Sequence, residues 1–338
     1  MLSRVADSLY WMSRYIERAE NIARILDVNM NLLLDLPNVK PEQVCRYWQA
    51  LITTNGDDEE FSTRHKQADA MNVTNFLTFD AQNANSIVSS IRSARENART
   101  VREQISSEMW EQLNRLYLFV RDHQTRDVLR EGSHGFYQAI KEGSQTFQGI
   151  TDATMTHGEG WEFIRGGKFL ERADKTTRIL DVKYFLLNAS AAEGNGSVDA
   201  VEWMSVLKSC SALEAYRKLY SAAVQPQTVV EFLLLDDVFP RSVKFSIAQI
   251  AEALFNVTPV RRSRFANDAQ KLAGRLRAQM EYSSVDDAFQ HGLHQYLDDL
   301  QVRFNAIGEA IHRSYIALPA DPAAEADSPS KKRAVWRS

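Results

Sequence analysis

Cysteine, glycine and proline are all scarce in this sequence, and each scarcity excludes a class of protein. Only two cysteines occur among 338 residues, Cys45 and Cys210, which excludes a disulfide-built secreted scaffold and favours a reducing, cytoplasmic setting. There are 14 glycines and 8 prolines, and strand-like alternation of polar and apolar residues is hard to find. The sequence therefore predicts an all-α fold.

Long hydrophobic runs are missing as well. The longest apolar stretches, around Leu32–Leu34 and Phe232–Leu235, are too short to cross a bilayer, so no membrane association is expected. The first residues carry charges every few positions without an apolar core, which predicts no signal peptide. The net charge of −4 provides no global field that would favour nucleic acid.

An internal repeat is the most informative feature that is present. Residues 15–28 and 169–182 share eight identical positions at an offset of 154, in the patterns Glu-Arg-Ala and Arg-Ile-Leu-Asp-Val. The register continues along both halves, where the matched pairs include Trp48 with Trp203, Asp80 with Asp236, and Phe147 with Phe304. We therefore predict two tandem, diverged helical-bundle repeats packed into one body. The first repeat is expected at 1–156, the second at 157–317, and a disordered tail rich in proline, alanine and charge at 318–338.

Each half is expected to hold about five helices. In the first half the expected ranges are 3–36, 41–54, 65–79, 84–123 and 126–155, with an exposed acidic loop at 55–60. In the second half they are 159–189, 198–222, 226–236, 241–281 and 284–316. Pro259 is expected to divide the fourth of these into 241–254 and 260–281.

The first helix carries a heptad of apolar residues, which is typical of the seam of a helix bundle. Its members are Val5, Leu9, Met12, Ile16, Ala19, Ala23, Leu26, Met30 and Leu33. A polar stripe lies beside this seam and consists of Glu17, Glu20, Arg24 and Asp27. Arg18 instead falls among apolar and aromatic residues, so this partly desolvated guanidinium should require a carboxylate or a bound anion.

Two interpretations of these charges remain open. In the structural one, Glu20–Arg24 and Asp174–Arg178 are ordinary i,i+4 pairs on a solvated stripe. Arg18 and Arg172 are then buried clamps between helices, with Glu17 and Glu171 as their partners from neighbouring helices. In the functional one, the two repeated helices face each other across a polar cleft that binds a phosphate, a carboxylate substrate or a divalent cation. The catalytic candidates are then Glu17, Arg18, Glu171 and Arg172, and the ligand-binding candidates are Arg24, Asp27, Arg178 and Asp181.

Other chemistry has weaker support. His291 and His294, close to Asp298, could form half of a metal site, but no second cluster completes it, so neither a metal nor a cofactor is expected. There is no phosphate loop, dinucleotide fingerprint or nucleophile elbow. A basic run is interpreted as a solvated helix face that could also meet RNA or an acidic partner, and it comprises Arg261, Arg262, Arg264, Lys271, Arg275 and Arg277.

The repeated segments resemble the alpha-E proteins, a bacterial all-helical family with a characteristic Glu-Arg motif. The resemblance rests on YIERAENIARIL at 15–26, FLERAD at 169–174, ENARTVREQISSEMWEQLN at 96–114 and FLLLD at 232–236, and it extends to about Ile316. The resemblance implies that the family's Glu-Arg motif corresponds to Glu17-Arg18 and Glu171-Arg172 of this sequence.

The resemblance implies a function only through neighbours. Alpha-E proteins usually occur beside, or fused to, an atypical ATP-grasp protein, which suggests a partner or accessory subunit of a peptide ligase or peptide-tagging system. The alternatives are a stand-alone enzyme that acts on an amide or acyl-phosphate intermediate through the duplicated Glu-Arg site, and a helical scaffold that binds protein or RNA. A homo-oligomer is compatible with each of them.

Overall fold

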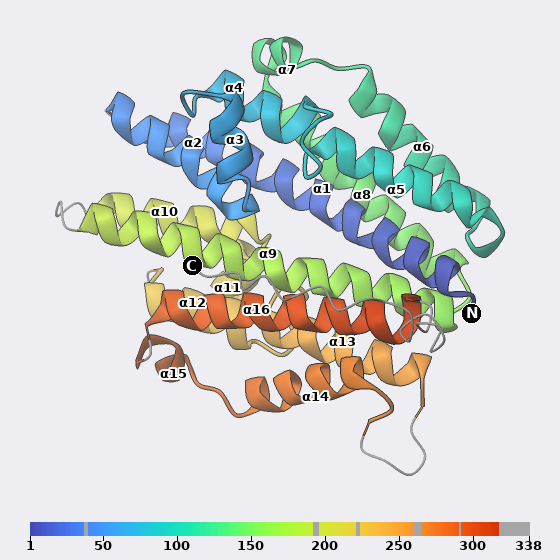
Figure 1. Ribbon diagram of the computed structural model, residues 1–338. Coiled ribbons are helices and arrows are strands. Elements are labelled where there is room, and N and C mark those ends of the chain that lie inside the picture. The colour runs from blue at the N-terminus through green and yellow to red at the C-terminus, as the bar shows by residue number, and fades with distance from the viewer. Residues whose placement is uncertain (37–39, 192–195, 221–223, 260–264, 291, 318–338) are drawn as a thin grey trace, which may run out of the picture.

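The computed structural model describes residues 1–36, 40–191, 196–220, 224–259, 265–290 and 292–317, and every regular element in these ranges is helical. Two long helices, α1 (Ser3–Asp35) and α9 (Glu159–Ala191), lie side by side through the centre of the molecule (Figure 1). The all-α prediction is therefore confirmed for the described residues. The predicted tail at 318–338 and the basic residues at 261, 262 and 264 lie outside them.

Shorter helices cover the two central ones on both sides (Figure 1). On the α1 side they are α2 (Pro41–Asn55), α3 (Asp58–Arg64), α4 (Ala70–Thr74), α5 (Ile87–Thr100), α6 (Ser107–Arg121), α7 (Thr125–Glu131) and α8 (Ser133–Thr154). On the α9 side they are α10 (Gly196–Ser209), α11 (Leu213–Leu219), α12 (Pro226–Leu235), α13 (Val243–Val257), α14 (Asp268–Glu281), α15 (Val285–Gln290) and α16 (Leu293–Ile311). Single-turn elements complete the chain at η1 (Asn75–Phe79), η2 (Arg102–Gln104) and η3 (His312–Ile316).

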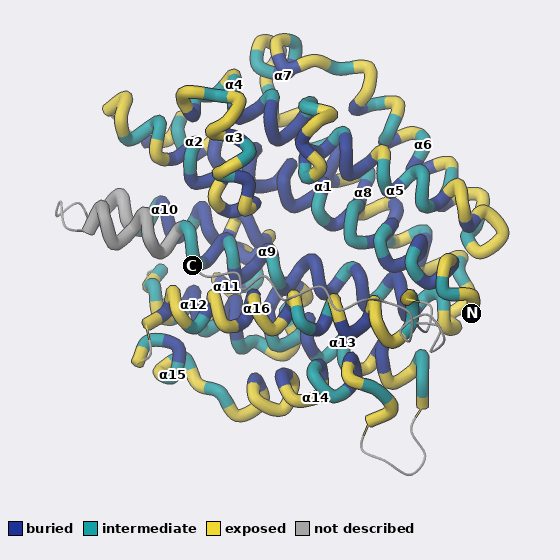
Figure 2. Tube along the Cα trace, in the orientation of Figure 1, coloured by how far each residue is buried: buried dark blue, intermediate teal, exposed yellow. Residues whose placement is uncertain are grey.

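The heptad of α1 supplies the centre of the core. Leu9, Met12, Ile16 and Leu26 are all at most 1% exposed, and they belong to one hydrophobic cluster that also contains residues of α9, α13 and α16. Figure 2 shows the result, with the middle of α1 and most of the described part of α9 buried, whereas outer helices such as α7 and α14 carry both buried and exposed residues. Burial of each such aliphatic side chain stabilises the fold by about 1.5–3 kcal/mol.

The central helices approach most closely at a glycine of α9. A Cβ atom at Gly167 would overlap the carbonyl oxygen of Tyr10 and would lie 2.5 Å from Ser13 Oγ. The neighbouring Gly166 is different, because the nearest atom to a Cβ there would be Ala253 Cβ at 4.0 Å. The missing side chain of Gly167 therefore sets the distance at which α1 and α9 can place their polar residues against each other.

Several predicted helices were too long. The single helix expected at 84–123 is two helices, because the chain turns at Val101 and Ser106 then caps α6 by accepting a hydrogen bond from the Met109 amide. The ranges 126–155 and 284–316 are each divided at a glycine, Gly132 with φ of 97° and Gly292 with φ of 84°. Positive φ ends a helix, and glycine adopts it at little cost.

Three further expectations about local structure were wrong. The helix expected at 198–222 is divided after α10, where Ser211 has a φ of 51°. Part of the acidic loop expected at 55–60 is helical, since α3 begins at Asp58 and has three acidic residues in its first turn. Negative charge at a helix N-terminus favours that end of the helix dipole, so the same acidic residues that indicated a loop stabilise a short helix. The helix expected at 65–79 begins only at Ala70.

No described helix combines the length and apolar character that a membrane crossing requires.

Candidate functional site

The two Glu-Arg motifs contact each other across the interface between α1 and α9. Arg172 donates from Nε to Glu17 Oε1 and from Nη2 to Glu17 Oε2, both at 2.8 Å. In the opposite direction, Arg18 donates from Nε to Glu171 Oε1 at 2.6 Å and from Nη2 to Glu171 Oε2 at 3.1 Å. Each motif therefore supplies the carboxylate for the other motif's guanidinium, in a bidentate geometry that suits arginine.

A further arginine extends the first of these pairs. Arg241 lies just before α13, and its Nη1 donates to Glu17 Oε1 at 2.9 Å and to Asn21 Oδ1 at 3.0 Å. Its Nη2 donates to Glu20 Oε1 at 2.5 Å. The carboxylate of Glu17 is thus shared by two guanidinium groups, Arg172 and Arg241, from two different parts of the chain.

The second pair has a different additional partner. Arg14 donates from Nε to Glu171 Oε2 at 2.9 Å, and a second nitrogen, Nη2, lies 2.8 Å from the same oxygen. Arg18 Nη1 also donates to Asn85 Oδ1 at 2.8 Å. Glu171 is therefore held by two arginines of α1, while the neutral Asn85 takes up the remaining donor of Arg18.

The polar stripe of α1 is buried, so its interpretation as a solvated surface was wrong. Glu17 and Glu20 are 0% exposed, Asp27 is 4% and Arg24 is 7% exposed. The i,i+4 pair is formed, with Arg24 Nη2 at 2.5 Å from Glu20 Oε1, but it lies in the interior. The reason is the packing of α8, α9 and the segment around Arg241 onto this side of α1, which a helical wheel of α1 alone cannot show.

Electrostatics keep the two motif carboxylates ionised. Burial alone would raise the pKa of Glu17, but the guanidinium groups of Arg172 and Arg241 outweigh it and hold that pKa far below its usual range. Burial likewise opposes ionisation of Glu171, and the neighbouring Arg18 and Arg14 lower its pKa far below the usual range. Both carboxylates are therefore charge-paired acceptors and not proton donors near neutral pH.

The predicted ligand-binding aspartates each meet a histidine. Asp27 Oδ1 accepts from His134 Nδ1 at 2.9 Å, and Asp27 Oδ2 accepts from Lys141 Nζ at 2.6 Å. Asp181 Oδ1 accepts from His294 Nδ1 at 2.7 Å. The structure thus places His294 beside Asp181. Among the described residues no group of three or more histidine, cysteine or acidic side chains is arranged for a metal, and His291 lies outside them.

The two predicted ligand-binding arginines differ in their surroundings. Arg178 pairs with Asp174 at 2.9 Å and its side chain is 25% exposed, as expected for an ordinary i,i+4 pair near the surface. Arg24 is buried, and its Nε has no hydrogen-bond partner among the described residues. Burial and the nearby Arg241 lower the pKa of Arg24.

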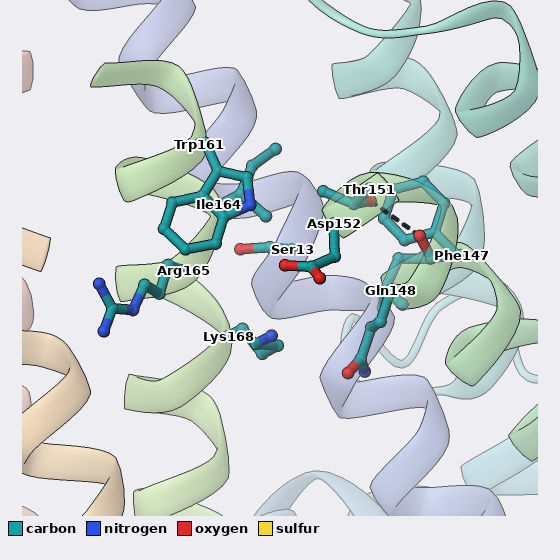
Figure 3. Close-up of a pocket in the computed structure, with 10 residues that line it drawn as sticks. Ser13, Phe147, Gln148, Thr151, Asp152, Trp161, Ile164, Arg165 and Lys168 are labelled. Atoms are coloured by element: carbon teal, nitrogen blue, oxygen red, sulfur yellow. Dashed lines mark hydrogen bonds between the residues drawn. The ribbon is translucent and has the colours of Figure 1, made fainter. Parts of the chain in front are cut away.

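Two cavities open beside the paired motifs. A narrow recess of about 30 Å³ lies between α1, α8 and α9, and Figure 3 shows Lys168, Gln148, Asp152 and Trp161 around it. Gln148 belongs to both the recess and the ion-pair network, since it donates to Glu17 Oε2 at 3.1 Å and accepts from Arg172 Nη2 at 3.3 Å. The recess is therefore separated from the buried Glu17 by only one amide side chain.

The other cavity is larger and more open. It has a volume of about 530 Å³ and lies between the start of α1 and the end of α16. Arg14 lines it, together with Trp11, Phe304, Asn305 and Glu309. Arg14 also pairs with Glu171, so this cavity borders the ion pair of Arg18 with Glu171. The recess borders the ion pair of Arg172 with Glu17 in the same way.

Several residues of this arrangement were not predicted. Arg241, Arg14, Gln148 and Lys168 all lie within the network or its cavities, yet none belongs to the Glu-Arg-Ala pattern. One signal was available for Arg241, because it stands at the repeat position of Asn85, where a polar residue again precedes a serine. The candidate roles of Glu17, Arg18, Glu171 and Arg172 in catalysis stay predictions.

Comparisons with known proteins agree with the Glu-Arg pattern. The sequence model of the Alpha-E family, described as a predicted alpha-helical domain with a conserved ER motif, matches residues 1–316. An uncharacterised protein of Mycobacterium bovis is 27% identical over 262 residues, which is 73% of this chain and 29% of that protein. An uncharacterised protein of Mycobacterium tuberculosis is 26% identical over the same length and coverage. The chain thus spans less than a third of these relatives, and no solved structure matches it.

Proposed function

The chain belongs to the Alpha-E family, and from this premise we propose that it is the partner or accessory subunit of an ATP-grasp-type peptide ligase or peptide-tagging system. The observation that carries this proposal is that the carboxylates of both motifs are fully engaged by arginines. Glu17 and Glu171 are 0% and 1% exposed, and each accepts from two arginines. Carboxylates committed in this way hold two helices together and are not poised to attack or protonate a substrate.

The length of the relatives supports an accessory role. In the mycobacterial proteins the segment similar to this chain makes up 29% of the whole, so there it is joined to a much larger part. A helical unit that works beside a separate catalytic protein or domain is consistent with the association of alpha-E proteins with ATP-grasp proteins. The ATP-grasp partner itself is inferred from the family resemblance.

We further propose that the chain arose by tandem duplication, with repeats at 1–156 and 157–317. Equivalent positions make equivalent contacts in support of this. Ser86 caps α5 by accepting from the Ser89 amide, and its hydroxyl donates to the Asp80 carbonyl. Ser242 caps α13 in the same way, and its hydroxyl donates to the carbonyl of Asp236. Both serines lie 156 positions apart, as do the two aspartates.

The accessory role is tested with an ATP-grasp protein from the same genome as this chain. The two proteins are co-expressed with a tag on one of them, and co-purification and the rate of ATP hydrolysis are measured with and without this chain. We expect a stable complex and a changed rate of ATP turnover with peptide substrates. Failure to co-purify together with an unchanged rate would overturn the proposal.

A stand-alone enzyme predicts a different result. If Glu17 and Arg18 were catalytic, Glu17→Gln and Arg18→Ala would abolish an activity of this chain alone and leave its melting temperature nearly unchanged. If they connect α1 with α9, the same substitutions lower the melting temperature first. Measuring melting temperature beside activity therefore separates the two functions.

A further inference from the structure

Among the described residues, Lys168 is a cation near Glu17 for which no hydrogen bond or ion pair to a carboxylate is formed. It lies on α9 one turn before Arg172, and Figure 3 shows its side chain pointing into the recess while Arg165 points away from it. Arg165 is bound by Gln249, Glu162 and Glu252. Among the described residues, Lys168 Nζ has only the ring of Phe169, at 4.8 Å from its centroid.

The corresponding position in the first half holds a cation that is ion-paired with a carboxylate. Arg14 stands 154 residues earlier, and it binds Glu171 through two nitrogens and Tyr10 Oη through a third at 3.2 Å. The difference arises at Glu17, whose oxygens already accept from Arg172 and Arg241. The residue at the repeat position of Arg241 is the neutral Asn85, so Glu171 retains capacity for Arg14.

The remaining wall residues also correspond between the recess and the larger cavity. At offsets of 154 or 157, Ile16 matches Leu170, Phe147 matches Phe304, Gln148 matches Asn305, and Asp152 matches Glu309. Among the residues that line them, both cavities thus share a matched cation, a matched amide, a matched acid and a matched aromatic ring. They differ in their cations, because Arg14 is paired with a carboxylate, whereas Lys168 has no such ion pair among the described residues.

Positive charge is in surplus on this side of the network. Glu17 and Glu20 supply two negative charges, whereas Lys168 and three arginines supply four positive charges, the arginines being Arg24, Arg172 and Arg241. The nearest further acid is Asp152, whose side chain is 72% exposed and therefore screened by solvent. Burial and the nearby Arg172 lower the pKa of Lys168 to about 8. Lys168 is therefore still charged at neutral pH, although its surroundings disfavour the charge.

We propose that the recess binds the carboxylate of a small ligand, the chain end of a peptide or an N-acylated amino acid, through an ion pair with Lys168. A volume of about 30 Å³ accommodates one or two water molecules, so only a planar head group fits there. The rest of the ligand lies against the apolar side chains of Trp161 and Ile164, which also line the recess. This site concerns a ligand of this chain alone and does not depend on an ATP-grasp partner.

Calorimetric titration of the full chain with N-acetylglycine at pH 7 tests the site. We expect saturable binding of N-acetylglycine and none of the uncharged N-acetylglycinamide. Lys168→Gln should weaken binding at least tenfold, whereas Lys208→Gln, which removes the same charge from an exposed lysine, should leave it unchanged. Asp152→Asn should tighten binding several-fold, because it removes the acid nearest to the ligand.

A second readout locates the ligand independently of any variant. Brief acetylation with acetic anhydride, followed by peptide mass spectrometry, should show N-acetylglycine protecting Lys168 and not Lys208. Absence of saturable binding, equal binding by the amide or by Lys168→Gln, tighter binding of inorganic phosphate, or unprotected Lys168 would each overturn the proposal. Because no partner protein is present, a negative result here leaves the proposed accessory role to its own test.

Discussion

Arg172 and Glu17, which stand 155 residues apart, form a bidentate ion pair in the interior of the protein. The pair is repeated in reverse by Arg18 and Glu171, so the two central helices exchange charges in both directions. A buried ion pair contributes little net stability when intact, but loss of one partner leaves an uncompensated charge inside the protein. The motif is therefore informative mainly through what happens when it is broken.

Removing the charge of Glu17 should destabilise the protein strongly. In Glu17→Gln, Arg172 and Arg241 lose the carboxylate they share, and breaking a buried pair typically costs about 3–5 kcal/mol. For a chain of this size we expect the melting temperature to fall by roughly 5–10 °C. Glu111→Gln, at an exposed position inside α6, is the matched control and should change it by less than about 1 °C. Equal melting temperatures for the two variants would refute the structural role.

Acid should remove the advantage that Glu17 provides. Its pKa is held far below the ordinary value of 4.5 by Arg172 of α9 and by Arg241, with Lys168 adding to the same effect. Below about pH 4.5 the unfolded chain takes up a proton at this group before the folded chain does, so stability falls with pH by about 1.4 kcal/mol per unit for each such carboxylate.

The difference between wild type and Glu17→Gln should therefore shrink as the pH is lowered from 6 to 3. Urea unfolding at several pH values measures it. Parallel stability curves across this range would show that Glu17 titrates normally in the folded protein.

Lys168→Gln should stabilise the protein at neutral pH, in contrast to Glu17→Gln, which should destabilise it. The folded pKa of about 8 lies below the ordinary 10.5, mainly through burial, then through Arg172 and more weakly Arg165, against the attraction of Glu17 and Asp152. Between these values the unfolded chain binds more protons, so wild-type stability rises with pH relative to the variant. At pH 7 we expect the variant to be more stable by on the order of 2 kcal/mol, with the difference fading towards pH 10.5. A variant less stable at pH 7 would contradict the surplus of positive charge.

The contact between α1 and α9 can be tested at two adjacent glycines. Gly167→Ala places a methyl group against the Tyr10 carbonyl and Ser13 Oγ, and we expect a loss of about 1–3 kcal/mol from the forced separation of the helices. Gly166→Ala meets nothing closer than 4.0 Å, and the gain in helix propensity should make it neutral or stabilising by up to about 1 kcal/mol. Thermal unfolding of both variants decides the matter, and a tolerated Gly167→Ala would show that the helices have room to move apart.

Much of the architecture could be predicted from periodicity. The heptad of α1 gave its length within one residue, and Pro41 marked the start of α2. The breaks at Gly132 and Gly292 were missed because a single glycine in an otherwise periodic segment is compatible with a continuous helix. Their positive φ values depend on how α8 and α16 fold back onto the central helices.

The site was harder to predict, because its contacts join helices that are distant in sequence. A wheel of α1 places Glu17 and Glu20 on a polar face, and such faces are usually exposed. The packing of α8, α9 and Arg241 against that face makes it interior. The desolvated position of Arg18 among aromatics was visible in the sequence, but its partner depends on the relative orientation of α1 and α9.

The reciprocal pairing also affects how the chain folds as the ribosome makes it. Helix α1 emerges long before Arg172 and Arg241 have been synthesised, so Glu17 and Glu20 have no guanidinium partners from α9 or α13 at that stage. Until those residues arrive, hydration of the two carboxylates opposes close packing of this face of α1. We therefore expect this face of α1 to reach its final packing only after the second half of the chain has been made.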